Sequence, residues 1–271
     1  MSKHSAVRSG LIDVGNDFGI RAFGRDIAVA SNCQEALATL ERFLLPSMPR
    51  IQSEIVGAEI DLRVLRDGHG FRLFCNGTNE FARDLSALAT QAVRLLDEAI
   101  VKCLTNLTAV HAGAVELAGR ALLLPGGTHA GKSALVAELL RRGAAYLSDE
   151  YALIDAEGQA HPYPRPLLLR NGGLEQVPFL PEECNARVGN APLMVRWIFA
   201  LEYDPAAIWQ IAPVPQSEAL LILLRNTPHV STESPRIVPA LKRASAGSEC
   251  YRGRRSNAVE AADEILRVIA E

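Results

Sequence analysis

The sequence predicts an α/β protein in which a nucleotide-binding domain follows a smaller α+β domain. Residues 126–133 match the pattern GxxxxGK[ST], in which a glycine-rich turn opens a helix. A short apolar run at 121–124 precedes this turn, and 132–142 has helical periodicity after it. A second apolar run at 144–147 completes the order strand, turn, helix, strand. That order is typical of a βαβ unit.

The first 104 residues have the pattern of a small α+β domain. Residues 18–30 favour strands, and Leu37, Leu40 and Leu44 then repeat at helical spacing. Residues 60–75 alternate apolar and polar side chains around a central Asp-Gly-His-Gly, which predicts a hairpin. A long amphipathic helix is expected from Asp84 onward, and the second domain is expected to span 105–271.

The rest of the second domain is less regular in sequence. Strands are expected at 108–117 and 120–124, joined by a turn at Gly119. Nine of the 15 prolines fall between Pro162 and Pro215, which predicts long loops and short strands there. The clearest strand in that segment is 195–201, and helices are expected at 217–224 and 258–270.

Composition excludes several classes of partner and compartment. A net charge of -3 provides no field that would attract nucleic acid or an anionic membrane. The apolar runs are too short to span a bilayer, and residues 1–10 lack the apolar stretch of a signal peptide. The five cysteines form no CxxC pair, which favours reduced thiols and a cytoplasmic location over disulfides or zinc. A homo-oligomer remains an open alternative.

The GxxxxGK[ST] match predicts a P-loop that binds ATP together with Mg²⁺. Glycines allow the backbone to turn successive N–H groups toward a polyphosphate, and the helix that follows adds its positive end. Lys132 is expected on the β- and γ-phosphates, and the Ser133 hydroxyl on Mg²⁺. The expected nucleotide-binding residues are Gly126, Gly127, Thr128, His129, Ala130, Gly131, Lys132 and Ser133.

Two carboxylates, Asp149 and Glu150, follow the strand expected after the P-loop helix. We expect that strand to lie beside the P-loop strand, with both carboxylates at its C-terminal edge, where open α/β sheets bind ligands. One carboxylate could hold Mg²⁺, directly or through water, and the other could accept a proton from an attacking hydroxyl.

Four other polar residues are weaker candidates. His111 lies on the strand before the P-loop strand, where a histidine is more often a core residue than a catalytic one. Arg165, Arg170 and Arg187 lie in the proline-rich segment. Each could contact phosphate or an acidic substrate, although a solvated surface position is commoner for any single arginine.

Residues 111–150 resemble the catalytic domain of the HPr kinase/phosphorylase family, bacterial enzymes that phosphorylate a serine of a carrier protein. The family has a His-Gly, the P-loop Lys-Ser, a helix ending in Arg-Gly and a strand ending in Asp-Asp, in that order. The matching pairs here are His111-Ala112, Lys132-Ser133, Arg142-Gly143 and Asp149-Glu150. Weaker likenesses follow at Arg170-Asn171-Gly172 and at Leu201-Glu202-Tyr203-Asp204.

The resemblance implies a P-loop kinase domain with a mixed sheet, like those of HPr kinase and PEP carboxykinase. It also implies that Asp149 is the general base and that His111 supports it. Ala134 and Leu168 stand where the family carries glutamates, and Glu150 stands for the second aspartate. These departures favour a divergent, HPr-kinase-related member of the family, some of which are encoded beside peptide-modification genes.

Three functions are compatible with these residues. The leading hypothesis is an ATP–Mg²⁺-dependent kinase that phosphorylates a serine-like hydroxyl on a peptide, protein or small molecule, with Asp149, His111 and Lys132 catalytic and Ser133, Asp149 and Glu150 at the metal. The alternative is a nucleotide-binding switch or weak NTPase without phosphotransfer. A third reading assigns specificity to the first domain, with an edge of hairpin 60–75 adding a bound peptide as a strand.

Overall fold

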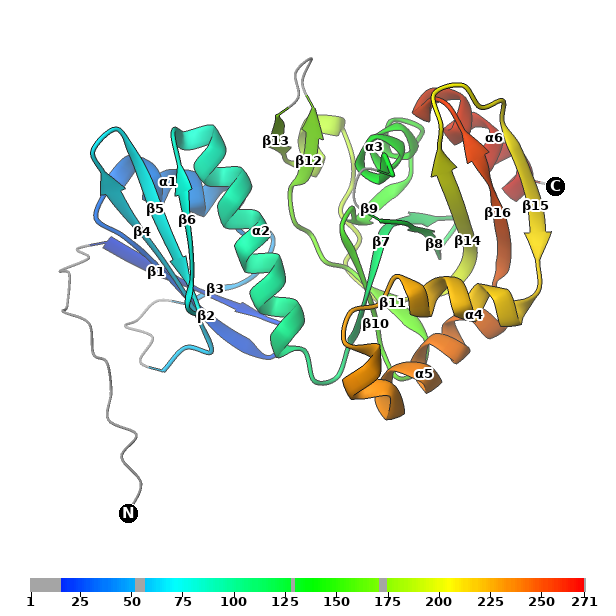
Figure 1. The fold of residues 1–271 in the computed structure, drawn as a ribbon, viewed down its shortest axis with the longest axis horizontal. Coiled ribbons are helices and arrows are strands. Elements are labelled where there is room, and N and C mark those ends of the chain that lie inside the picture. Colours follow the sequence, from blue (N-terminus) through cyan, green and yellow to red (C-terminus); the bar gives the residue numbers. More distant parts are fainter. Residues whose placement is uncertain (1–15, 52–56, 128–129, 171–174, 271) are drawn as a thin grey trace. The chain divides into compact units, whose positions relative to one another are not determined.

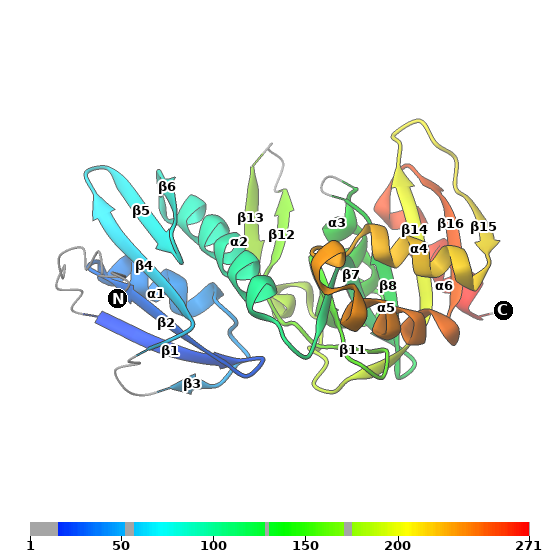
Figure 2. The same ribbon diagram turned by 60° about the horizontal axis from the view of Figure 1, so that its bottom comes forward.

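The computed structural model describes residues 16–51, 57–127, 130–170 and 175–270 (Figures 1 and 2). The chain divides into two compact units. The first takes the described parts of Met1–Arg42 and Met48–Ala99, and the second takes Phe43–Ser47 and Ile100–Glu271. The division therefore falls within a helix, Leu85–Cys103 (α2), whereas the sequence suggested a boundary just after that helix.

The first unit is a mixed sheet with helices, in the strand order β3-β1-β2-β4-β5-β6. Helix α1 buries the side chains of Ala36, Leu37 and Leu40, as its periodicity predicts. Asp84 caps α2, because its Oδ1 accepts the N–H of Ala87 at 2.8 Å. The elements are β1 (Asn16–Ala22), β2 (Arg25–Ser31), α1 (Gln34–Phe43), β3 (Arg50–Ile51), β4 (Ile60–Asp67), β5 (Gly70–Cys75), β6 (Thr78–Ala82) and α2.

Strands β4 and β5 form the expected hairpin, but neither strand has an open edge. β4 pairs with β2 on its other side, in parallel, and β5 pairs with β6. A peptide therefore has no edge of hairpin 60–75 to extend, and that part of the sequence-based prediction is wrong. β6 covers the hairpin because the chain turns back at once after Cys75.

The second unit is an α/β domain around a mixed sheet in the order β11-β10-β7-β8-β14-β16-β15, with β9 paired to β7. Its strands are β7 (Thr108–Leu117), β8 (Arg120–Pro125), β9 (Ala145–Ser148), β10 (Tyr151–Ile154), β11 (Gln159–His161), β14 (Leu193–Tyr203), β15 (Gln210–Val214) and β16 (Glu249–Arg255). β12 (Leu167–Arg170) and β13 (Gln176–Phe179) form a separate pair, and a short 3-10 helix covers Pro181–Cys184.

Helices cover both faces of this sheet, as Figures 1 and 2 show. On one face, α4 (Gln216–Arg225) and α5 (Val230–Ala246) pack on a core that contains Leu123. On the other face, α3 (Lys132–Arg141) and α6 (Ala258–Ala270) pack on a core that contains Leu122 and Leu124. Successive residues of β8 thus serve opposite cores, as the period of two along a strand requires.

The strand that precedes Asp149 and Glu150, β9, lies one place farther from β8 than the sequence suggested. β9 pairs with β7, and β7 pairs with β8 through the hairpin turn at Gly119. The parallel neighbour of β8 is instead β14, from the proline-rich segment. The expectation that β9 lies beside β8 is therefore wrong, because the long strand β7 takes the place between them.

Helix α5 differs from a simple reading of the sequence. Helix α5 forms although it contains Pro235 and Pro239, and its backbone departs from helical angles at Glu233. Pro235 thus stands near the start of a new helical stretch, where the missing N–H costs little. Among the helices within the described residues, none has the length and apolar composition needed to cross a membrane.

Candidate functional site

The glycine-rich loop, defined here as residues 126–131, connects the C-terminal end of β8 to α3. Gly131 has a φ of 70° and begins the helix without a side-chain cap. The first N–H groups of any helix lack intrahelical acceptors, so the start of α3 offers donors to an anion. Thr128 and His129, two of the expected nucleotide-binding residues, lie outside the described residues.

Lys132 lies against the glycine-rich loop rather than extending into solvent. Its Nζ donates to the carbonyl oxygens of Gly126 and Gly127, at 2.9 and 3.0 Å. The residue is only 8% exposed. Burial lowers the pKa of Lys132, and the nearby carboxylates of Glu150 and Asp149 offset part of that effect. A buried ammonium held at the base of the loop is a strong attraction for phosphate oxygens.

His111 and Glu150 complete a cluster with Lys132. The Nε2 of His111 lies 3.0 Å from the Nζ of Lys132 and 2.8 Å from Oε1 of Glu150. Backbone bonds fix both partners, since the N–H of Gly126 donates to the carbonyl of His111 and the N–H of Ala112 donates to the carbonyl of Glu150. We call these three side chains the Lys132–His111–Glu150 cluster.

One ring nitrogen of His111 faces both an ammonium and a carboxylate. It cannot donate to Glu150 and accept from Lys132 at the same time. Burial alone would raise the pKa of Glu150, but the bond to His111 and the charges of Arg165, His111 and Lys132 outweigh it and lower that pKa to about 2. Glu150 is therefore ionised at neutral pH, and we assign the Nε2 proton to the bond with this carboxylate.

Asp149 has a different environment from Glu150, although the two residues are adjacent. Its side chain is fully buried and forms an ion pair with Arg165, which is 1% exposed. Its Oδ1 also accepts the hydroxyl of Tyr146 at 3.2 Å, and its Oδ2 accepts the N–H of Leu168 at 3.3 Å. Both carboxylate oxygens of Asp149 thus have partners within the protein.

The three arginines of the proline-rich segment do not share one environment. Arg170 and Arg187 are exposed, as a surface position predicts. Arg165 is buried against Asp149, so the surface position is wrong for this residue. A buried carboxylate needs a charged partner, and Arg165 supplies it from a segment that returns beside β9. A hydrogen bond also holds this segment beside β9, because the Tyr146 hydroxyl donates to the Arg165 carbonyl at 2.8 Å.

Arg255, at the end of β16, contacts the last residues of the glycine-rich loop. Its Nη2 donates to the carbonyl oxygens of Ala130 and Gly131, both at 2.8 Å. The residue is 3% exposed, and its guanidinium lies 5.5 Å from the ring centre of Tyr203. No motif in the sequence singled out Arg255. Two buried cations therefore bind described carbonyls of the loop: Lys132 binds those of Gly126 and Gly127, and Arg255 binds those of Ala130 and Gly131.

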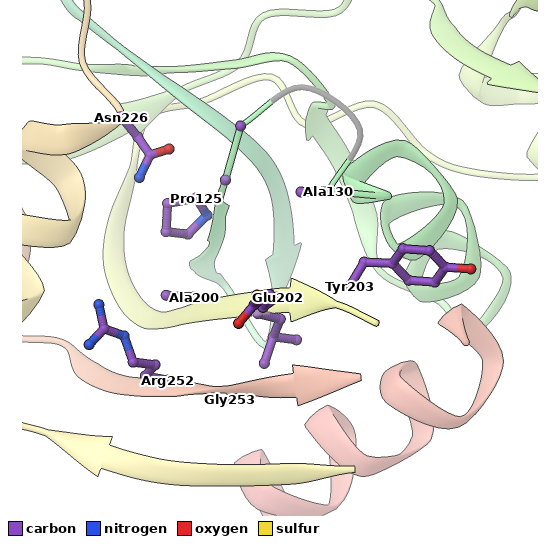
Figure 3. A pocket seen from close by; sticks show the side chains of 11 residues that line it. Pro125, Ala130, Ala200, Glu202, Tyr203, Asn226, Arg252 and Gly253 are labelled. Atoms are coloured by element: carbon purple, nitrogen blue, oxygen red, sulfur yellow. The ribbon is translucent and has the colours of Figure 1, made fainter. Parts of the chain in front are cut away.

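A pocket of about 500 Å³ opens beside the glycine-rich loop (Figure 3). Gly126 and Gly127 line it from the loop, and Glu202 lines it from the end of β14. Arg252 of β16 and Asn226, which follows α4, complete its polar wall. Figure 3 shows the ring of Tyr203 pointing away from these side chains. Sequence reasoning missed this pocket because its residues come from four separate segments.

The structure thus brings together part of the expected site. Lys132, His111 and Glu150 converge, and Ser133 lies half-buried on the first turn of α3. Asp149 is close enough to influence the charge of Lys132, but its described contacts are with Arg165, Tyr146 and Leu168. Its expected role as general base stays a prediction.

Comparisons with known proteins give little beyond this geometry. No protein-family model matches the sequence, and no curated protein matches it. Among solved structures, the HPr(Ser) kinase/phosphatase from Coxiella burnetii matches with 14% sequence identity and a TM-score of 0.31. The match covers 60% of this chain and 97% of that one. An identity and a TM-score this low carry no argument about activity, so the chain is assigned to no family.

Proposed function

We propose that the protein is an ATP–Mg²⁺-dependent phosphotransferase that acts on a hydroxyl group of a peptide, protein or small molecule. The observation that supports this most directly is the Lys132–His111–Glu150 cluster at the base of the glycine-rich loop. It combines a buried phosphate-binding cation with a group that accepts protons. Phosphoryl transfer requires little else from a protein besides correct positioning.

In the proposed reaction, the acceptor oxygen forms a bond to the γ-phosphorus of ATP. The bond from that phosphorus to the β–γ bridging oxygen breaks, and ADP leaves with the electron pair. Lys132 and the N–H groups at the start of α3 bind the phosphate oxygens. As Lys132 turns toward the phosphates, its contact with Nε2 of His111 is replaced, and His111 keeps its bond to Glu150.

The hydroxyl proton is assigned to the His111–Glu150 pair. A carboxylate whose pKa is about 2 holds a proton weakly, so Glu150 serves to orient and stabilise a protonated His111. With the Nε2 proton on the bond to Glu150, Nδ1 carries the lone pair that accepts the new proton. Asp149 is the competing base, as the family resemblance implies, and substitutions at the two positions separate these assignments.

We infer that magnesium would be held mainly by the phosphates, because no group of three or more His, Cys, Asp or Glu side chains that could hold a metal lies among the described residues. Mg²⁺ in such sites keeps several waters and takes only one or two protein ligands. Ser133 and Glu150 would supply them, whereas Asp149 is already paired with Arg165. When bound, the ion neutralises charge that develops between the β- and γ-phosphates.

The proposal is tested by incubating the full chain with γ-labelled ATP, Mg²⁺ and pools of peptides and metabolites, and searching for phosphorylated products by mass spectrometry. We expect a product that Lys132→Ala abolishes and that Lys242→Ala, at an exposed lysine of the same unit, leaves unchanged. Glu150→Gln and His111→Gln should each lower transfer at least tenfold. Thermal melting of each variant checks that it is folded.

The Asp149→Asn variant decides between the two assignments of the base. If folded Asp149→Asn protein loses transfer while folded His111→Gln protein keeps it, then Asp149 is the base and our assignment of His111 is wrong. If no product forms under any condition although Mg-ATP binds, the protein is not a kinase.

That last result would favour a nucleotide-dependent switch. The burial of Asp149 against Arg165 favours this second candidate, because the carboxylate expected at the acceptor is engaged inside the protein. Ala134 and Leu168, which stand where the HPr kinase family that residues 111–150 resemble carries glutamates, favour it as well. Calorimetry would then show tight binding of Mg-ATP, and turnover assays would show neither ADP nor a phosphorylated product.

A further inference from the structure

The pocket beside the glycine-rich loop lies at the carboxyl edge of three parallel strands. β14 runs parallel to β8 on one side and to β16 on the other. Pro125, Glu202 and Gly253 bring the ends of these strands to the pocket. Ligands of α/β sheets bind at this edge, and the glycine-rich loop rises from the same edge. The pocket and the phosphate-binding loop therefore share one opening.

The pocket and the Lys132–His111–Glu150 cluster lie on opposite sides of β8. The strand order is β9 or β10, then β7, β8, β14 and β16. His111 is on β7 and Glu150 lies between β9 and β10, whereas the pocket uses β14 and β16. A triphosphate that crosses the loop with its terminal group toward His111 thus directs its other end toward β14.

Asn226 connects the two regions. Its carbonyl accepts the N–H of His111 at 2.6 Å, and the same residue lines the pocket. Figure 3 shows its amide directed toward Pro125 and the pocket. One extended ligand can therefore reach from the cluster, past Gly126 and Gly127, into the pocket without leaving the carboxyl edge of the sheet.

The chemistry of the pocket suits a sugar and a base. Pro125, Ala130 and Leu201 give it apolar surface. The amide nitrogen of Asn226 donates to the carbonyl of Ile222 at 2.9 Å, and its amide oxygen is an acceptor. Glu202 points its carboxylate into the same space, and its Oε2 lies 3.4 Å from Nε of Arg254. A carboxylate accepts several hydrogen bonds, so Glu202 keeps capacity for the two adjacent hydroxyls of a ribose.

We propose that this pocket binds the ribonucleoside part of the phosphoryl donor and that Glu202 accepts hydrogen bonds from its ribose hydroxyls. The inference rests on the proposed function, because it takes the glycine-rich loop as the triphosphate site. It excludes the acceptor from the pocket. The acceptor hydroxyl has to reach the terminal phosphate beside His111, which is the end of the ligand farther from β14 and β16.

The inference is tested by calorimetry on the full chain with three Mg²⁺-bound probes: ATP, 2′,3′-dideoxy-ATP and tripolyphosphate. ATP should bind most tightly, because it alone offers both the base and the ribose hydroxyls. Glu202→Gln should lower the affinity for ATP about tenfold, since one charge-assisted hydrogen-bond pair is lost. The affinity for tripolyphosphate should not change. The matched control is Glu249→Gln, a carboxylate on β16 that pairs with Arg196 away from the pocket.

A second variant, Ala200→Leu, fills the pocket from β14. It should lower the affinity for ATP more than the affinity for tripolyphosphate. Equal affinities of ATP and tripolyphosphate in the unchanged protein, or variants that weaken both probes alike, would overturn the nucleoside site alone. A phosphorylated acceptor whose KM rises with Glu202→Gln while the affinity for ATP stays constant would assign the pocket to the acceptor instead. Absence of binding by all three probes would overturn the nucleoside site and the proposed function together.

Discussion

Asp149 and Arg165 form an ion pair in which the two side chains are 0% and 1% exposed. Such a pair holds its charges away from water, so each partner depends on the other. The pair also separates two neighbouring carboxylates, since Asp149 faces the interior while Glu150 faces His111 and Lys132. Asp149 thereby acquires a structural role that its position in the sequence does not reveal.

Replacing Arg165 by Met should destabilise the protein by about 3–5 kcal/mol, because the carboxylate of Asp149 is then buried without its countercharge. Urea unfolding at pH 7 measures this free energy. The control is Arg187→Met at an exposed arginine of the same segment, which should cost less than 1 kcal/mol. A double variant, Arg165→Met with Asp149→Leu, should recover part of the loss. Similar small losses for Arg165→Met and Arg187→Met would contradict the structural role.

The sequence could predict the elements of the βαβ region but not their neighbours. Periodicity and caps are local signals, and helices α1, α2, α3, α4 and α6 follow them. β9 pairs with β7 rather than with β8. The choice of neighbour in a sheet depends on contacts between distant segments, and local sequence patterns do not predict it. In the same way, Arg165 is one of many arginines in the sequence, and only the return of its segment beside β9 pairs it with Asp149.

Glu150 should make folding stability depend on acidity. Its pKa is about 2 in the folded protein, against 4.5 for an unperturbed glutamate, so the ionised form stabilises the fold. That contribution is present above about pH 4.5 and is lost as the pH falls toward 2. Urea unfolding of the unchanged protein and of Glu150→Gln should therefore give a difference that shrinks between pH 5 and pH 3. A constant difference over that range would rule out the hydrogen bond between His111 and an ionised Glu150.

Gly131 should tolerate no side chain. Its φ is 70°, and a Cβ atom there would lie 2.6 Å from Nη2 of Arg255, which the loop carbonyls hold in place. Gly119→Ala is the matched control, because Gly119 has a φ of 73° and open space around it. Gly131→Ala should lose about 1–3 kcal/mol more stability than Gly119→Ala, since only the former is overpacked.

The same two variants also test the loop as a phosphate site. Calorimetry with tripolyphosphate should show weaker binding for Gly131→Ala and unchanged binding for Gly119→Ala. Equal stability losses in the two variants would show that Arg255 is not packed against Gly131.

The candidate site was only partly accessible from sequence. The sequence predicts Lys132 as a phosphate-binding residue because the glycine spacing before a helix is a strong local signal. Arg255 and Asn226 approach the loop from segments far along the chain, with no spacing that marks them. Glu150 and Asp149 are adjacent in the sequence, which does not show their different environments. In the fold, Asp149 is buried against Arg165, whereas Glu150 pairs with His111 beside Lys132.

The most direct test of the account is the affinity of the full chain for Mg-ATP, measured by calorimetry beside the Lys132→Met variant. Lys132 is buried at the base of the glycine-rich loop and bonded to two of its carbonyls, and in the proposed function its ammonium turns from His111 to the phosphate oxygens. We expect saturable binding to a single site that weakens at least tenfold, or about 1.4 kcal/mol, in Lys132→Met. Equal affinities in the two proteins, or no binding by the unchanged chain, would contradict the assignment of the loop as a polyphosphate site.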